Sequence, residues 1–184
     1  MATAALSRRH AALLLAGLPW CLRAQAADSK AADACEWLPA ARLQGQGRLT
    51  FLGLNVYSAK LWVLAGFKPD EFTHQPLVLE LEYARSLTGR LIAERSLVEM
   101  KRAGDVPETR ARPWLAAMSQ AFPDVVKGDR LSGLYQPDEG MRFFCNGKPC
   151  GEVRDAMFAQ RFIGIWLSPH TSEPQLRQAL LGAA

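Results

Sequence analysis

The stretch that most constrains the fold is LVLELEY at residues 77–83, where apolar and polar side chains alternate over most of its length. In an extended strand, successive side chains point to opposite faces of a sheet. The odd-numbered residues therefore share one apolar face, and the even-numbered residues, which include two glutamates, share the other. We expect a strand with one buried face and one face in water.

Hydrophobic spacing and turn residues predict the other elements in the same way. Strands are expected at residues 48–52, 54–64, 77–83, 130–136 and 141–145, and helices at 89–102, at 111–121, from Asp155 to Trp166, and between Ser172 and Gly182. Strands, helices, strands and helices thus follow one another with short connections. This order is typical of an α+β fold, with an antiparallel sheet and helices packed on one face.

Residues 1–26 have the features of a secretory signal peptide. Basic residues precede the apolar run AALLLAGLPW, which is too short to span a bilayer core of about 30 Å, and an A-x-A site favours cleavage between Ala26 and Ala27. An apolar anchor and an alanine-rich tail are the alternatives, and both Sec and twin-arginine export stay open. We therefore divide the 184 residues into a signal (1–26), a lead-in (27–44) and one domain (45–184).

Charge gives the domain no general attraction to polyanions. The whole chain carries a formal charge of +4, but residues 1–26 hold three arginines and no acid, which leaves 19 basic and 18 acidic side chains in the remainder. A nearly neutral domain lacks the basic surface typical of nucleic-acid binding. We expect no nucleic-acid partner and no stable membrane insertion once the signal is removed, and the sequence makes no prediction of oligomeric state.

Two cysteines flank a turn signal in FFCNGKPCGEV, residues 143–153. Asn-Gly between apolar runs is typical of a β-hairpin. A four-residue loop would place Cys145 and Cys150 opposite each other, within disulfide reach, and an oxidising compartment favours that bond. Free thiols and a C-x4-C metal half-site are the alternatives, although the sequence offers no second half-site. Cys35 has no evident partner.

Arg48 is the residue on which the function depends, because it lies among apolar residues in GRLTFLGL. In a strand, Arg48, Thr50 and Leu52 share one face, whereas Leu49 and Phe51 share the other. The residues alone favour Leu49 and Phe51 pointing inward, with Arg48 in water. In the opposite orientation a guanidinium enters an apolar cleft, where it needs a carboxylate from the protein or from a ligand.

Other candidate residues carry weaker signals. Tyr57 and Tyr83 are expected either in the core or as hydrogen-bond partners of an acidic head group. Trp166 is expected in helix packing, and the charged residues among 94–102 are interpreted as solvated helix surface. The sequence lacks the common nucleophile, phosphate-loop, zinc-protease and dinucleotide motifs. We therefore predict no metal, no cofactor and no catalytic residue.

Five segments in order resemble bacterial chalcone isomerase-like domains. They are GQGRLTFLGLNVYSAKLWV, PLVLELEYARSLTGR, VKGDRLSGLYQPDEGMRFFCNGKPCGEV, DAMFAQRFIGIWLS and LRQALLG, and they extend over about residues 43–182. The resemblance implies the chalcone isomerase-like fold, which is a large antiparallel sheet with a layer of helices on one face and a ligand cleft between the two.

The resemblance also implies two kinds of function. Plant members close a chalcone to a flavanone, whereas related members bind fatty acids without catalysis, and in both a strand arginine holds the anionic group. Arg48 matches that arginine. The catalytic threonine, tyrosine and asparagine fall near Ala59, Ile92 and Glu99. An anchor without those polar groups binds substrate and transition state about equally, which gives binding without catalysis.

The sequence therefore predicts an exported, periplasmic or secreted, chalcone isomerase-like protein that binds a small amphipathic acid such as a fatty acid. Arg48, Tyr57 and Tyr83 are the expected ligand-binding residues. An intramolecular lyase acting on a chalcone-like substrate is the first alternative. A structural or partner-binding protein without a ligand is the second, and it would be favoured by a filled cleft or by Arg48 paired with Glu80 or Glu99.

Overall fold

The computed structural model describes residue 34 and residues 36–182. The predicted signal peptide, its cleavage site at Ala26 and Ala27, and Cys35 lie outside the described residues.

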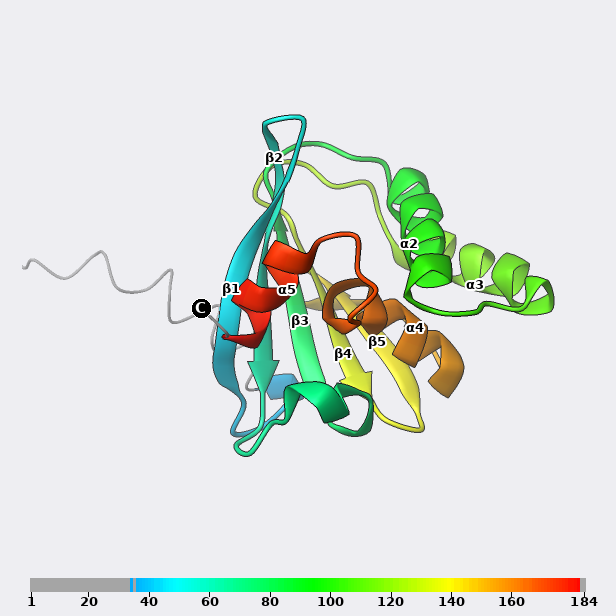
Figure 1. The fold of residues 1–184 in the computed structure, drawn as a ribbon. Coiled ribbons are helices and arrows are strands. Elements are labelled where there is room, and N and C mark those ends of the chain that lie inside the picture. Colours follow the sequence, from blue (N-terminus) through cyan, green and yellow to red (C-terminus); the bar gives the residue numbers. More distant parts are fainter. Residues whose placement is uncertain (1–33, 35, 183–184) are drawn as a thin grey trace, which may run out of the picture.

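Six antiparallel strands form one sheet in which every strand lies beside its neighbours in the sequence. The strands are β1 (Arg42–Phe51), β2 (Leu54–Val63), β3 (Leu77–Tyr83), β4 (Arg130–Gln136), β5 (Gly140–Cys145) and β6 (Lys148–Val153). Figure 1 shows the sheet with the β1–β2 hairpin extending beyond the other strands at one end.

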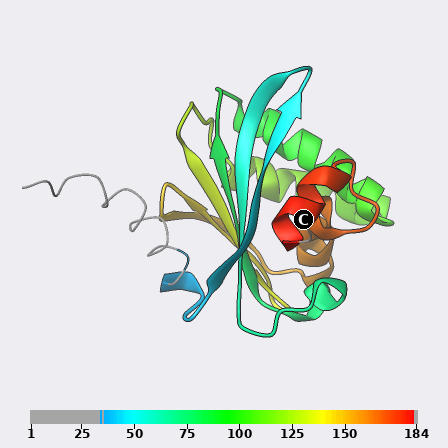
Figure 2. The ribbon, with the colours of Figure 1, turned by 60° about the vertical axis from the view of Figure 1, so that its left-hand side comes forward.

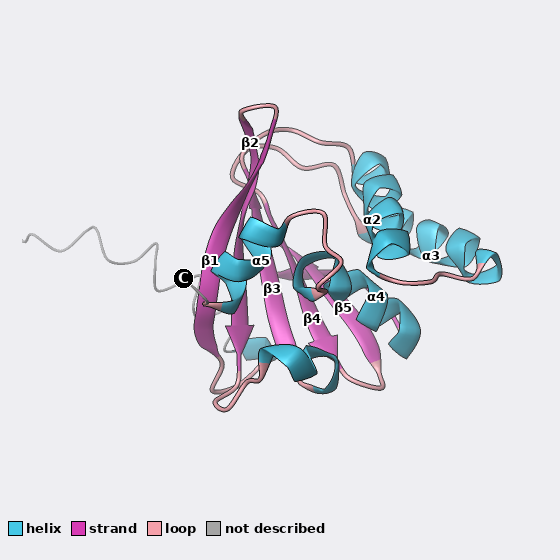
Figure 3. Ribbon diagram, in the orientation of Figure 1, coloured by secondary structure: helices cyan, strands magenta, loops and turns pink. Residues whose placement is uncertain are grey.

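The long helices gather on one face of this sheet, as Figure 3 shows. They are α2 (Gly89–Ala103), α3 (Glu108–Ala121), α4 (Ala156–Leu167) and α5 (Pro174–Leu181), and a short 3-10 helix, η1 (Pro69–His74), connects β2 to β3. α4 packs on β4 and β5, α5 packs on β1 and β2, and α3 packs on β6, while α2 packs on α3 and α4. The predicted α+β fold, an antiparallel sheet with helices on one face, is confirmed.

Side-chain caps fix the starts of α2 and α4. The hydroxyl of Thr88 accepts the Leu91 N–H at 3.4 Å, and the carboxylate of Asp155 accepts the N–H groups of Met157 and Phe158 at 2.9 and 3.1 Å. Such caps satisfy amide groups that have no partner within the helix. Desolvation raises the pKa of Asp155, but these bonds, the Trp114 indole and Arg110 outweigh it and hold the pKa below its usual value.

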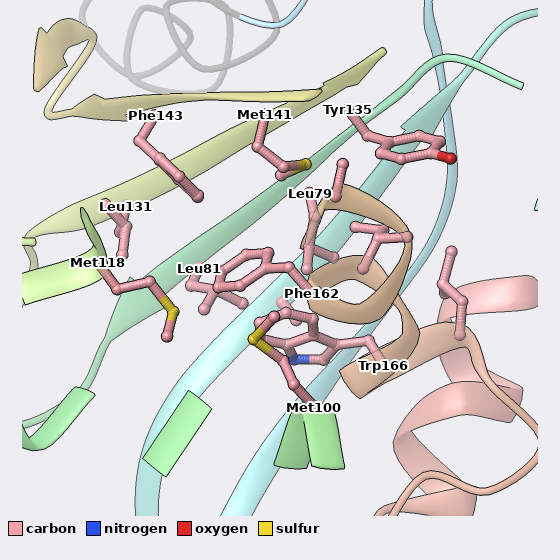
Figure 4. Packing of buried hydrophobic residues seen from close by; sticks show 14 of the residues in the cluster. Leu79, Leu81, Met100, Met118, Leu131, Tyr135, Met141, Phe143, Phe162 and Trp166 are labelled. Carbon is pink, nitrogen blue, oxygen red and sulfur yellow. The ribbon is translucent and has the colours of Figure 1, made fainter. Parts of the chain in front are cut away.

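The core lies between the sheet and the helices and is rich in aromatic rings (Figure 4). The ring of Phe143 on β5 lies 5.0 Å from that of Phe122 and 5.2 Å from that of Phe162, measured between centroids. Phe158 and Phe162 are both on α4, and their rings stack with centroids 5.6 Å apart. This cluster holds α4 against the sheet, because edge-to-face and offset ring pairs add to the effect of apolar burial.

The outer face of β3 is not in water, contrary to expectation. Val78 is buried against a second apolar cluster supplied by the chain before β1, in which Trp37 stacks on Phe144 with centroids 3.9 Å apart. Glu80 is only 3% exposed and lies 3.7 Å from the Lys60 ammonium and 3.4 Å from the Arg130 guanidinium. The even-numbered residues of β3 therefore face a partly covered surface. Figure 2 shows the segment before β1 on the side of the sheet away from the helices.

Two elements begin three or more residues earlier than predicted. β1 begins at Arg42 and not at residue 48, because it pairs with β2 along nearly all its length. Part of the predicted lead-in therefore belongs to the sheet. α3 begins at Glu108, three residues earlier than expected, and Pro113 lies within the helix.

The β5–β6 hairpin is tighter than the four-residue loop that the sequence suggested. Cys145 pairs directly with Lys148, and Asn146 and Gly147 form a two-residue turn with φ values of 51° and 83°. Asn-Gly is the preferred sequence for a turn with two positive φ angles. Cys145 and Cys150 form a disulfide, with Cα atoms 5.8 Å apart.

Candidate functional site

A cavity of about 390 Å³ lies between the sheet and the helices. β1, β2 and β3 form its floor, α2 and α4 form two walls, and the segment leading into α5 closes another side. The apolar side chains around it are Leu49, Phe51, Val56, Leu81, Leu87, Leu91, Ile92, Leu131, Phe162, Ile165 and Leu176. This volume falls in the range of small-molecule sites, which are mostly apolar with a few placed polar groups.

Strand alternation determines which side chains reach the floor. Leu49 on β1 is opposite Tyr57 on β2, and Tyr57 is opposite Tyr83 on β3, so these three side chains lie in one row across the sheet. The sheet therefore offers the cavity two aromatic hydroxyl groups beside a leucine.

The two tyrosines are suited to donate hydrogen bonds into the cavity. The Tyr57 hydroxyl accepts the Trp166 indole N–H at 3.0 Å, and neither tyrosine hydroxyl donates to an acceptor elsewhere in the described chain. Burial raises the pKa of Tyr57 and of Tyr83 well above the usual value for tyrosine, although the Trp166 bond partly opposes this for Tyr57. Both phenols are thus neutral near pH 7 and keep their protons for an acceptor.

α2 supplies the charged part of the wall. Ile92, Arg95, Ser96 and Glu99 occupy one side of this helix and all line the cavity. Glu99 is 6% exposed, and its carboxylate lies 2.6 Å from Arg95 Nη2 and 3.4 Å from Arg102 Nε. The interpretation of this charged run as solvated surface is wrong for Glu99, which these two arginines stabilise within the wall.

Arg48 lies outside the cavity. It is exposed and pairs across β1–β2 with Ser58, on the face opposite Leu49. It forms no ion pair with any carboxylate in the described chain, and Glu80 contacts Lys60 and Arg130. The orientation favoured by the residues alone, with Leu49 and Phe51 inward, is therefore the one observed.

Among the described residues, Arg85 and Arg95 are the two arginines that line the cavity. Arg95 carries the ion pair with Glu99, whereas Arg85, in the loop after β3, forms no ion pair within the described residues. Sequence reasoning missed both, as well as the contact of Trp166 with Tyr57. A signal was present for α2, since Ile92, Ser96 and Glu99 follow the four- and three-residue spacing of one helix face.

The positions that the family resemblance assigned to catalysis lie in two different environments. Ile92 and Glu99 line the cavity, whereas Ala59 is completely buried in the main core, on the same face of β2 as Tyr57, and does not line the cavity. No group of three or more His, Cys, Asp or Glu side chains within residues 34 and 36–182 is placed to hold a metal ion. In the same residues, no helix is both long and apolar enough to cross a bilayer.

Comparison with known proteins gives a family and a fold. Residues 40–182 match a family model described as chalcone isomerase-like. An uncharacterized protein of Haemophilus influenzae is 30% identical over 152 residues, which cover 83% of this chain and 71% of the relative. The crystal structure of a fatty-acid binding protein of Arabidopsis thaliana superimposes with a TM-score of 0.59, covering 79% of this chain and 88% of its own at 12% identity. At that identity the likeness shows the shared fold.

Proposed function

The chain belongs to the chalcone isomerase-like family, and we propose that it is a non-catalytic protein that binds a small amphipathic acid, such as a fatty acid, between its sheet and helices. The observation that carries the proposal is the cavity of about 390 Å³, whose wall is mostly apolar and whose charged groups are concentrated on α2 and the adjoining loops. Each methylene that an acyl chain buries there contributes about 0.8 kcal/mol to binding.

The head group would lie against Tyr57, Tyr83 and Arg95. The phenols supply neutral donors, and the guanidinium has five N–H groups, so that one arginine can serve both Glu99 and a ligand carboxylate. Arg85 adds a second positive charge beside the cavity, which offsets the repulsion of an anion by Glu173 in the same lining. Arg48 takes no part in this arrangement.

Ligand binding by paired arginine variants tests the proposal. Arg95→Gln is expected to weaken binding of a long-chain fatty acid about tenfold, the equivalent of losing one charged hydrogen bond, whereas Arg48→Gln leaves it unchanged. Delipidated protein is titrated calorimetrically, and native preparations are denatured so that released acids can be identified. Because Arg95 also stabilises Glu99, the double variant Arg95→Gln/Glu99→Gln serves as a control without an unpaired buried carboxylate. Absence of fatty-acid binding by the parent protein would refute the proposal.

The same preparations distinguish binding from catalysis. If the protein is non-catalytic, the absorbance of a chalcone is expected to decay at the same rate with the protein as in buffer alone. Acceleration of that decay, abolished by Tyr57→Phe, would instead support an intramolecular lyase.

We also propose that the protein is exported and loses residues 1–26. The signal-like sequence supports this, as does the Cys145–Cys150 disulfide, a bond that persists in oxidising compartments. Mass spectrometry of the protein from a periplasmic fraction, kept free of reductant, is expected to find a chain beginning at Ala27 with that disulfide intact. Recovery of the protein only in the cytoplasmic fraction, with an intact N-terminus and reduced cysteines, would contradict export.

A further inference from the structure

Large apolar side chains are exposed around the entrance to the cavity. Phe51 and Leu91 line the cavity and are nevertheless 61% and 49% exposed. The tip of the β1–β2 hairpin adds Leu52 and Leu54, at 86% and 57%, and the loop before β4 adds Val126 at 56%. We call these five side chains the apolar rim.

Backbone bonds keep the parts of the apolar rim at one end of the molecule. Ala84 N–H donates to Val56 O at 2.9 Å, which holds the loop after β3 against the start of β2, and Leu87 pairs with Val125 beside Val126. Figure 1 shows the hairpin projecting at this end, with both loops below it. Five of the eight large apolar side chains exposed in the described chain thus lie at one end of the molecule, where two of them, Phe51 and Leu91, border the cavity, and such a grouping is unlike scattered single exposure.

Leu52 is the least expected member of the apolar rim. It has φ 50° and precedes Gly53 at φ 77°, so these two residues form a turn with two positive φ angles. The β5–β6 hairpin makes the same kind of turn with Asn146 and Gly147. Asparagine suits this conformation and leucine does not. Leu52 is therefore unfavourable for the backbone and buries almost nothing, which points to a role for its side chain outside the folded chain.

Cationic side chains lie beside the apolar rim. Arg48 is three residues from Phe51, Arg85 lines the cavity, and Lys127 follows Val126. None of these three side chains forms an ion pair within the described residues. The nearby Asp124 and Asp129 accept the backbone N–H groups of Gly89 and Val126, each at 2.8 Å. Apolar side chains flanked by such cations suit a bilayer surface that carries anionic head groups, because the side chains enter its interface while the cations meet the phosphates.

We propose that the apolar rim docks the protein on an anionic lipid bilayer, with the cavity entrance facing the membrane. This inference goes beyond the proposed function. It rests on the proposed function only to explain what docking is for, since an acyl ligand that partitions into membranes would enter and leave the cavity through the docked opening. Contact is peripheral and reversible, because a hairpin tip inserts a few side chains and no spanning segment.

Vesicle flotation of the mature chain without added ligand tests the docking. The parent protein is expected to float with vesicles containing phosphatidylglycerol and to remain unbound with phosphatidylcholine alone. Leu52→Asn/Leu54→Thr is expected to lower the partition coefficient at least tenfold while folding normally, since Asn suits the turn and Thr suits a strand. The double variant Arg48→Gln/Lys127→Gln is expected to lower the partition coefficient severalfold and to make the coefficient less dependent on salt.

Val98→Asn is the matched control, because Val98 is 55% exposed on α2 but lies outside the apolar rim and the cavity lining. It is expected to float like the parent protein. Docking is overturned if the parent chain never floats, if the tip double variant floats equally well, or if the rim instead mediates a concentration-dependent dimer seen by sedimentation. Fatty-acid titration without vesicles is measured separately, so failure of docking and failure of ligand binding give different results.

Discussion

Substituting Ile92→Trp is expected to lower fatty-acid affinity about a hundredfold without unfolding the protein. Ile92 lies on α2 at the cavity wall and is only partly buried, so an indole at this position can extend into the open space. If the ring displaces about four methylenes of the acyl chain, the loss is about 3 kcal/mol, equivalent to about two orders of magnitude in the dissociation constant. Calorimetric titration measures this loss, and circular dichroism verifies the fold.

Val98→Trp makes the same change in side-chain size on the exposed side of the same helix. It is expected to bind fatty acid like the parent protein. Equal affinity of all three proteins would mean that the acyl chain lies elsewhere, and the proposed site would then be wrong.

The largest expected loss of stability follows from Phe143→Ala. Phe143 is 1% exposed and its ring contacts those of Phe122, Phe158 and Phe162. Removing a buried phenyl ring typically costs about 3–5 kcal/mol, because apolar burial is lost and the cavity left behind closes only in part. We expect the free energy of unfolding to fall by about 4 kcal/mol, measured by urea denaturation.

Met157→Ala, at a 38% exposed position on α4, provides the comparison and is expected to change stability by less than about 0.5 kcal/mol. A similarly small effect for Phe143→Ala would show that the aromatic cluster does not hold α4 on the sheet. Because Phe162 belongs both to this cluster and to the cavity wall, Phe143→Ala is also expected to weaken ligand binding.

Strand alternation predicted more of the site than the family resemblance did. It placed Leu49 and Phe51 inward and Arg48 in water, and the structure agrees. Matching Arg48 to the family's ligand arginine reversed that orientation, because a motif gives a position along the chain and not the face on which a side chain lies. A bulge between Leu49 and Thr50 also shifts the register at the hairpin end, where small differences in strand length decide which side chains reach the cleft.

Other features depend on contacts distant in sequence and could not be predicted locally. The even-numbered residues of β3 are polar enough to suggest solvent, yet Val78 is buried in a cluster that includes the segment before β1, and Glu80 is buried beside Lys60 and Arg130. Glu99 lies in a charged run that is typical of an exposed helix surface, but α2 packs so that this carboxylate faces the cavity. In both cases the parts of the chain that cover the residue decide whether it is buried. Those parts are distant in the sequence and are known only from the tertiary structure.

The contact between the last helix and the first strand has a consequence for the order in which the protein can fold. α5 lies directly over Gly45 and Gly47, where any Cβ atom would clash with it, and Gln44 Nε2 donates to Leu181 O at 2.9 Å. β1 is an edge strand, and α5, which packs on its face, follows every strand of the described sheet in the sequence. Until α5 is made, the face of this edge strand at Gly45 and Gly47 is uncovered, which adds to the hazard that an unpaired strand edge presents to other chains. A nascent chain, or one truncated before residues 174–181, is therefore expected to aggregate more readily than a chain that contains α5.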